Sequence, residues 1–314
     1  MRPPTYANIV DAAVRIGPYV HRTPIFTSRY FDDLVGADIF FKAENLQKVG
    51  AFKARGATNA VLSLSDADAA RGVVTHSSGN HGQAVAYAAG IRLIPAVVVM
   101  PNHAPAVKVD AVAGYGGEIV FCEQDEREST VRTIEAESGA VVIHPFDNAD
   151  VIAGQGTVSL EFVDQVEDLD TIVAPIGGGG LLSGASLVGK HDGIDVIGAE
   201  PEIVDDAFRS LRDGVRYGPT GRLSVGDGLL TGIGEFAFAI LHAHDRQVLT
   251  VSEDEILEMV SVVATRMKLV IEPSAATAVA AVVRYKEIFA GRRVGIIISG
   301  GNISLNLFAG SGDR

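Results

Sequence analysis

The chain has 314 residues, 47% of them hydrophobic, which is enough for about two domains with buried cores. Asp and Glu number 39 against 26 Lys and Arg, so the net charge is −13, and binding to nucleic acid or to an anionic membrane is disfavoured. The single cysteine, Cys122, cannot form an internal disulfide, and neither an N-terminal signal segment nor a membrane-spanning apolar run occurs. These features predict a cytoplasmic protein.

Short β-branched runs alternate with helical stretches along the chain, which predicts parallel sheets flanked by helices. The expected strands are 93–100, 118–121, 141–144, 171–176, 195–199 and 293–299, and the expected helices are 81–89, 106–113, 128–137, 152–166 and 253–267. No linker rich in Pro, Gly or Ser divides the chain. We therefore expect a small domain at 71–144, inserted in a large ligand-binding domain made of 1–70 and 145–314.

The 35 glycines gather in short clusters, of which Gly177-Gly178-Gly179-Gly180 is the longest. It follows the expected strand 171–176 and precedes a helical stretch, where free backbone N–H groups and the helix N-terminus favour a phosphate. A tight turn without a ligand is the alternative. The pattern Gly178-x-Gly180-x-x-Ser183, followed by Glu200, also approximates a dinucleotide fingerprint. That pattern would indicate a nucleotide-dependent oxidoreductase or a binding module.

Lys53 lies among small apolar residues, including Ala51, Ala54 and Ala57. An amine in such surroundings is desolvated, which lowers its pKa and frees its lone pair for Schiff-base chemistry. A surface lysine beside Arg55 on a helix is the alternative interpretation.

Two polar clusters complete the set of candidate segments. The run His76-Ser77-Ser78-Gly79-Asn80-His81 leads into the expected helix 81–89, where hydroxyl and amide groups can bind a carboxylate or a cofactor hydroxyl. Simple N-capping is the alternative there. The run Ser299-Gly300-Gly301-Asn302 follows the last expected strand, where a tight turn alone would also explain it.

In this order, the segments resemble the serine/threonine dehydratase and serine racemase family of pyridoxal-phosphate (PLP) enzymes, known as fold type II. The resemblance runs nearly from end to end and rests on residues 40–47, 50–57, 77–83, 152–157, 177–184 and 299–302. It implies an α/β fold with two open, twisted, mostly parallel sheets flanked by helices, and a small domain inserted in a large one. It also implies a homodimer.

The resemblance further implies which residues hold PLP. Lys53 would form a Schiff base with the cofactor, Phe52 would pack on its ring, and Asn80 would hydrogen-bond its 3′-hydroxyl. Ser299 would bond the pyridine nitrogen. The phosphate would be held by Gly177, Gly178, Gly179, Gly180 and the Leu181 N–H.

The implied reaction is loss of water from a β-hydroxy amino acid such as L-serine or L-threonine, which gives a 2-oxo acid and ammonia. Lys53 would remove the α-proton, while Ser77 and Ser78, with His81 in the same loop, would bind the substrate. Ser78 also matches the hydroxyl that reprotonates Cα in the racemases. A serine racemase with elimination as a side activity is therefore an alternative.

Two positions bear on the choice of substrate. Thr231 aligns with a hydroxyl of the substrate pocket, and Arg127 aligns with an arginine near it, although the chain is one residue shorter there. If Arg127 faces the pocket, it can pair with a second carboxylate, which favours 3-hydroxyaspartate. If it faces solvent, an ordinary serine/threonine dehydratase is expected.

The resemblance also implies a divalent cation. In relatives with this pattern, the positions of Glu200, Asp206 and the carbonyl of Val204 hold the metal. Oxygen ligands of this kind suit Mg²⁺, Mn²⁺ or Ca²⁺. A solvated acidic surface is the alternative.

Overall fold

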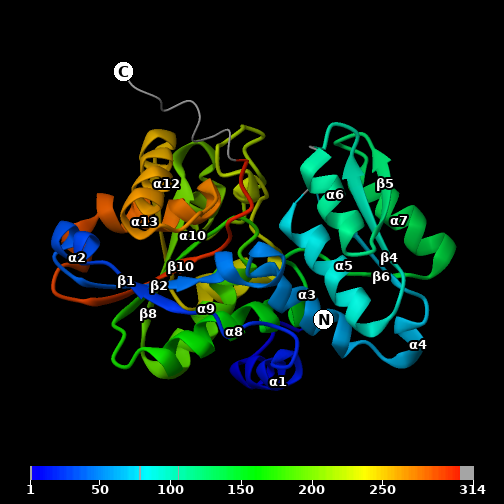
Figure 1. The fold of residues 1–314 in the computed structure, drawn as a ribbon, viewed down its shortest axis with the longest axis horizontal. Helices are drawn as coiled ribbons and strands as arrows, with labels where there is room; N and C mark the ends of the chain where they lie inside the picture. The colour runs from blue at the N-terminus through cyan, green and yellow to red at the C-terminus, as the bar shows by residue number, and fades with distance from the viewer. Residues whose placement is uncertain (1, 78, 105, 305–314) are drawn as a thin grey trace.

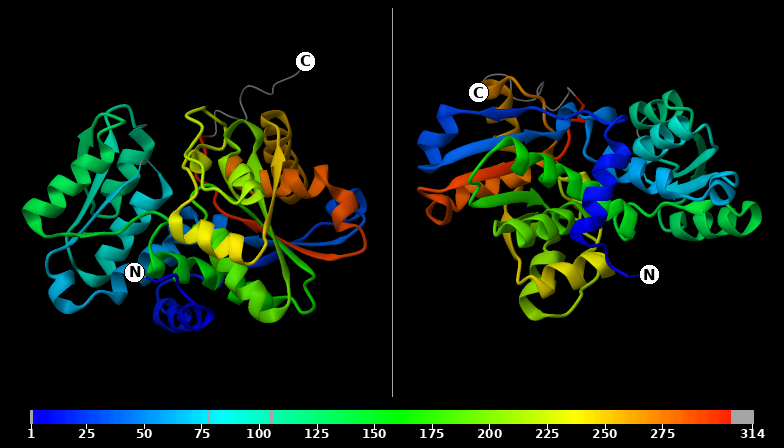
Figure 2. Two further views of the ribbon diagram at one scale, coloured as in Figure 1. Left: turned by 180° about the vertical axis from the view of Figure 1, so that it is seen from behind. Right: turned by 90° about the horizontal axis from the view of Figure 1, so that it is seen from below.

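The computed structural model describes residues 2–77, 79–104 and 106–304, and these form two lobes that each contain a β-sheet (Figure 1). One sheet has six strands and the other has four, and helices flank both (Figure 2). The expected α/β architecture with two mostly parallel sheets is confirmed. Within the described residues, no helix is long and apolar enough to cross a membrane.

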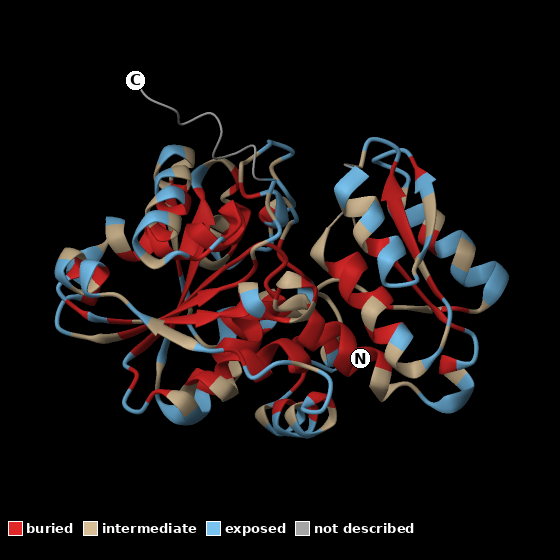
Figure 3. Cartoon of the chain, in the orientation of Figure 1, coloured by how far each residue is buried: buried red, intermediate tan, exposed pale blue. Residues whose placement is uncertain are grey.

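The six-stranded sheet has the order β1-β2-β10-β7-β8-β9 and is parallel except for β1, which pairs antiparallel with β2. Its strands are β1 (Ile25–Thr27), β2 (Asp38–Ala43), β7 (Thr171–Pro175), β8 (Asp195–Pro201), β9 (Gln247–Val251) and β10 (Arg293–Ile298). The central strands β7 and β10 are buried along almost their whole length, because helices cover both faces of the sheet (Figure 3).

The four-stranded sheet is parallel throughout and has the order β5-β4-β3-β6. Its strands are β3 (Val73–His76), β4 (Ala96–Pro101), β5 (Glu118–Cys122) and β6 (Val141–Val142). All four lie within residues 71–144, the segment expected to form the inserted domain, and that division of the chain stays a prediction.

Helices connect the strands and flank both sheets (Figure 2). They are α1 (Tyr6–Ile16), α2 (Arg29–Val35), α3 (Lys53–Ser63), α4 (Asp66–Ala69), α5 (Asn80–Arg92), α6 (Ala106–Gly114), α7 (Arg127–Ser138), α8 (Ala149–Gln165), α9 (Gly180–Asp192), α10 (Asp206–Asp213), α11 (Glu235–Ala243), α12 (Glu253–Met267), α13 (Pro273–Arg284) and α14 (Lys286–Phe289). Helix α8 packs against α1, α3 and α9, so it joins the N-terminal part of the chain to the glycine-rich segment.

A buried cluster of charged residues fixes α3. The Arg55 side chain is 1% exposed, and its guanidinium lies 2.7 Å from Glu44 Oε1 and 3.1 Å from Glu161 Oε2. Lys42, also fully buried, places its Nζ 2.5 Å from Glu161 Oε1. A buried charge is tolerated only with such partners. The cluster therefore ties α3 to the segment after β2 and to α8.

The contact between α3 and α8 occurs at two glycines. A Cβ atom on Gly154 of α8 would lie 2.6 Å from Gly56 Cα and 2.7 Å from the Arg55 carbonyl oxygen, both in α3. Only glycine permits this approach, and the approach sets where α3 and its first residue, Lys53, lie.

We expect Gly154→Ala to lower the free energy of unfolding by about 1–3 kcal/mol, although alanine has the higher helix propensity, because the added methyl overpacks the contact. Gly114→Ala is the matched control, since a Cβ there meets no heavy atom within 4 Å. Urea denaturation measures both. Equal stability of the two variants would contradict the account.

Candidate functional site

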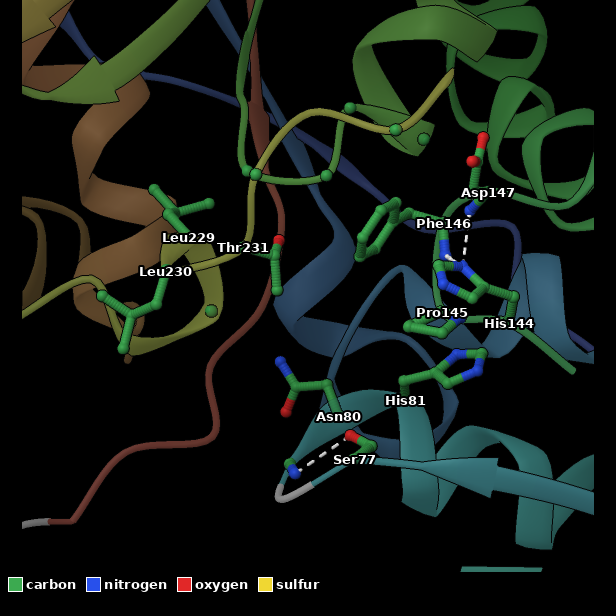
Figure 4. A pocket seen from close by; sticks show the side chains of 18 of the residues that line it. Ser77, Asn80, His81, His144, Pro145, Phe146, Asp147, Leu229, Leu230 and Thr231 are labelled. Atoms are coloured by element: carbon green, nitrogen blue, oxygen red, sulfur yellow. Dashed lines mark hydrogen bonds between the residues drawn. The ribbon is translucent and has the colours of Figure 1, made fainter. Parts of the chain in front are cut away.

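A cavity of about 850 Å³ is lined by residues of both lobes. Its walls include the segments that follow β3, β6, β7 and β10, at the carboxyl ends of parallel strands. Figure 4 shows Ser77, Asn80 and His81 on one side and Leu229, Leu230 and Thr231 on another. The sequence-predicted residues that line this cavity are Phe52, Lys53, Ser77, Asn80, His81, Arg127, Gly177, Gly178, Gly179, Gly180, Leu181, Thr231 and Ser299. Ser78 lies outside the described residues.

Lys53 is the first residue of α3 and projects to the cavity wall. Its Nζ donates to the Pro145 carbonyl oxygen at 2.9 Å and lies 5.2 Å from the centroid of the Phe52 ring. Burial lowers the pKa of Lys53 to about 8, while the negative charge of Glu272 acts in the opposite direction. The amine is thus available as a neutral nucleophile or base close to neutral pH.

Two helices begin at the cavity with a glycine at the N-cap. Gly79 precedes α5 and Gly179 precedes α9, so neither N-cap has a side chain that could bond to the free N–H groups of the first turn. Gly179 adopts φ +85°, a conformation that favours glycine. Each of the two helices has 13 residues, so its N-terminus presents unbonded donors and a positive dipole end to an anion.

The segment after β6 covers the glycine loop. A Cβ on Gly178 would lie 2.1 Å from Phe146 Cγ, so the phenyl ring rests directly on the loop. Asp147 anchors this segment, because its two oxygens accept from the N–H groups of Glu235 and Phe236, at 3.0 and 2.9 Å, in the first turn of α11. His144 Nδ1 accepts from Asp147 N at 2.9 Å (Figure 4).

Three histidines at the cavity are held neutral. Burial lowers the pKa of His81 well below its usual value, and the charge of Lys53 adds to this effect. Burial and the neighbouring His76 lower the pKa of His144 to about 4. Burial and the charge of Arg127 lower the pKa of His76. Neither His76 nor His144 was assigned a role from the sequence, although His76 ends β3 and His144 follows the adjacent parallel strand β6.

Arg127, at the start of α7, differs from Lys108 and from the other arginines at the cavity in its lack of an ion-pair partner among the described residues. Its Nε donates to the Gln124 carbonyl oxygen at 3.0 Å, and within the described chain no carboxylate lies within ion-pair distance of it. The others are paired: Lys108 with Asp227 at 2.6 Å, Arg132 with Glu128 at 3.5 Å and Arg216 with Glu235 at 3.2 Å. Arg127 therefore has its guanidinium available for an external carboxylate.

Glu272 and Asn302 also line the cavity. Asn302 lies in the run that follows the last expected strand but was given no role there, and Glu272 was missed altogether. Glu272 is 5% exposed, and a buried carboxylate next to a candidate Schiff-base lysine is not visible in a sequence pattern. The sequence did contain one signal for its position. Proline favours the first position of a helix, so the pair Glu272-Pro273 indicates that Glu272 stands at a helix start.

The expected metal ligands lie apart from the cavity lining. Glu200 and Asp206 are buried, as is Val204, and burial raises the pKa of Glu200 to about 8. Both Glu200 oxygens accept from N–H groups of α10, those of Ala207 and Phe208, at 3.0 and 2.8 Å. Both carboxylate oxygens are therefore engaged at the start of α10. This arrangement does not support the role of Glu200 as the ribose-binding acid of a dinucleotide fingerprint.

Asp206 has one satisfied oxygen and one without a partner. Its Oδ2 accepts from the N–H of Ile233, a cavity residue, at 3.1 Å, whereas Oδ1 is buried and makes no hydrogen bond within the described chain. No group of three or more His, Cys, Asp or Glu side chains suited to a metal occurs among the described residues. The expected set has only two carboxylates and one carbonyl, so this observation does not bear on it.

Comparisons with known proteins agree with this geometry. The family model described as "Pyridoxal-phosphate dependent enzyme" matches residues 16–300. The chain is 46% identical over 307 residues to the β-hydroxyaspartate dehydratase of Paracoccus denitrificans, covering 96% of this chain and 98% of that protein. It is 44% identical over 311 residues to the L-threo-3-hydroxyaspartate ammonia-lyase of Saccharomyces cerevisiae, covering 98% and 95%.

Among solved structures, the serine racemase of Dictyostelium discoideum superposes with a TM-score of 0.92 at 45% identity, covering 96% of this chain and 99% of that one. The family match spans most of the chain, and the fold agrees over nearly its whole length. The chain therefore belongs to the pyridoxal-phosphate dependent enzyme family, with the fold type II architecture that its sequence predicts.

Proposed function

We propose that this protein uses PLP to eliminate water from 3-hydroxyaspartate, giving oxaloacetate and ammonia. Its general activity is that of a PLP-dependent ammonia-lyase of hydroxy amino acids. The observation that carries the choice of substrate is Arg127, a cavity cation without a carboxylate partner in the described chain. Two relatives at 44–46% identity are named for the same substrate class.

The residues at the cavity fit PLP. Lys53 is the desolvated amine to which the aldehyde would attach, and the uncapped start of α9 after Gly179 suits the phosphate. Phe52 would pack on the ring, Asn80 would donate to the ring hydroxyl, and Ser299, buried just after β10, would face the pyridine nitrogen. When bound, PLP supplies the electron sink that makes loss of an α-proton feasible.

The chain's own groups would divide the remaining work. The uncapped start of α5 and the Ser77 hydroxyl, which accepts from Gly79 N at 3.2 Å, bind the α-carboxylate. Arg127 binds the second carboxylate, beside the neutral imidazole of His76. Lys53 Nζ takes the α-proton, a step that its lowered pKa favours near neutral pH. Phe146 and the loop that carries Thr231 shield the site from water.

Three further features belong to the proposal. Glu200, Asp206 and the Val204 carbonyl would hold a divalent cation such as Mg²⁺, Mn²⁺ or Ca²⁺, because Asp206 Oδ1 is a buried anionic ligand without a partner in the described chain. The ion would steady the loop that contains Ile233. A homodimer follows from the family resemblance, and a cytoplasmic location is consistent with the single cysteine.

Serine racemase activity is the second candidate. It is supported by the serine racemase of Dictyostelium discoideum, which is 46% identical over 310 residues. In that case Ser78 would return the proton to Cα on the face opposite Lys53. Formation of D-serine from L-serine at a rate comparable to elimination would favour it.

Lys53→Met should stabilise the protein prepared without cofactor by about 1–3 kcal/mol at pH 7, because the wild type holds a desolvated ammonium there. The lysine pKa is about 8 in the folded chain and about 10.5 in the unfolded chain. The unfolded state thus binds more protons between these values, and wild-type stability rises with pH in this window. Denaturation at pH 7 and pH 10.5 checks that the difference between the proteins shrinks; a constant difference would contradict it.

The wild type should show a kcat/KM at least about 100-fold higher for 3-hydroxyaspartate than for L-serine or L-threonine, because only the former can pair with Arg127. Arg127→Met should lower kcat/KM for 3-hydroxyaspartate by about 10–100-fold, mainly through KM. Steady-state assays of 2-oxo acid release measure both.

Arg132→Met is the matched control. Because Arg132 is already paired with Glu128, this substitution should change KM little. The substrate assignment is wrong if wild type prefers L-serine, or if the two arginine variants lose activity equally on all substrates.

Mg²⁺ added to EDTA-treated protein should raise the melting temperature by several degrees, since a ligand of the native state stabilises it by mass action. Asp206→Asn should abolish this response. Asp205→Asn should keep it, because the Asp205 carboxylate pairs with Arg209 at 2.9 Å. Thermal melts with and without Mg²⁺ decide, and an unchanged response of Asp206→Asn would remove the metal from the proposal.

A further inference from the structure

Glu272 is a buried carboxylate held against the last loop of the site. It precedes the first residue of α13, and its backbone N–H donates to the Gly300 carbonyl oxygen at 3.1 Å. A Cβ on Gly300 would lie 2.6 Å from Glu272 Oε1, so the carboxylate occupies the space that this glycine leaves free. Its place is thus fixed by the segment that follows Ser299.

The carboxylate faces the amide of Asn80. Asn80 Nδ2 donates to Glu272 Oε1 at 3.0 Å and to Oε2 at 3.1 Å. In its ionised form the carboxylate can only accept hydrogen bonds, so it favours the orientation in which the amide turns its NH₂ group toward Glu272. Burial raises the pKa of Glu272 to about 7, and the Asn80 hydrogen bond opposes this by favouring the ionised form.

Asn302 fixes the other end of the same amide. Its Nδ2 donates to Asn80 Oδ1 at 2.8 Å and to the Val49 carbonyl oxygen at 2.7 Å. A backbone carbonyl can only accept, so Val49 sets the orientation of Asn302, and Asn302 in turn sets that of Asn80. Two independent partners, one at the N-cap of α13 and one in the segment after β10, thereby select one of the two amide orientations of Asn80.

This arrangement leaves one Asn80 hydrogen for the cofactor. The Nδ2 group carries two hydrogens, and the carboxylate oxygens lie on one side of it. We propose that Glu272 and Asn302 are positioning residues that lock the Asn80 amide so that its remaining N–H donates to the ring hydroxyl of PLP. The inference rests on the proposed function, since it concerns the same bound PLP.

A double-mutant cycle with PLP affinity as the readout tests the proposal. Glu272→Ala and Asn302→Asp should each weaken PLP binding about tenfold in full-length protein that has been stripped of cofactor. Asn302→Asp is the sharper change, because it keeps the shape but offers Asn80 an acceptor instead of a donor. Both should also shift the absorption band of the bound cofactor. In an Asn80→Ala background, either change should alter the Kd less than about twofold.

The possible outcomes distinguish failure of the positioning role from failure of the proposed function. Equal losses of affinity with and without Asn80 would mean that Glu272 and Asn302 act on the fold or on PLP directly, which overturns the inference alone. A wild type that takes up no PLP overturns the proposed function and the inference together. Circular dichroism identifies a variant that fails to fold. If Glu272→Ala fails to fold, the PLP affinity of the exposed, conservative Asn302→Asp variant decides between these outcomes.

Discussion

The desolvated amine of Lys53 is the constraint around which the site is built. A lysine pKa lowered to about 8 requires that protein, not water, surround Nζ, so α3 must be held firmly in place. The Arg55 ion cluster and the contact of Gly154 with α3 provide this hold. Both act within two turns of Lys53. Each also lowers the stability of the fold, the first through the desolvation of buried charges and the second through the low helix propensity of glycine.

The charge distribution of the cavity follows from the same constraint. Ammonium and imidazolium groups near Lys53 are disfavoured, and the three histidines stay neutral accordingly. Attraction for anions comes instead from groups that cannot lose a proton near pH 7. These are the starts of α5 and α9 and the guanidinium of Arg127. Under the proposed function, a phosphate and two carboxylates would thus be bound by groups whose charge does not change near pH 7.

Sequence alone predicted the fold class and most elements with a clear pattern, such as α12 and β10, whose bounds differ by at most one residue from expectation. It missed β1, β2, β3 and β9, because short strands beside charged or polar residues have no distinct period. Local glycine and serine motifs marked the cavity loops. The surroundings of Glu272 and His144 could not be read this way, since each depends on contacts between segments far apart in the chain.

The central claim is that Lys53 carries PLP, and chemical mapping tests it most directly. Holoenzyme can be reduced with borohydride, digested, and searched by mass spectrometry for the phosphopyridoxyl group on each of the seven lysines, Lys42, Lys48, Lys53, Lys108, Lys190, Lys268 and Lys286. The account predicts the label on Lys53 alone. Label on another lysine, or none on any peptide, would contradict it.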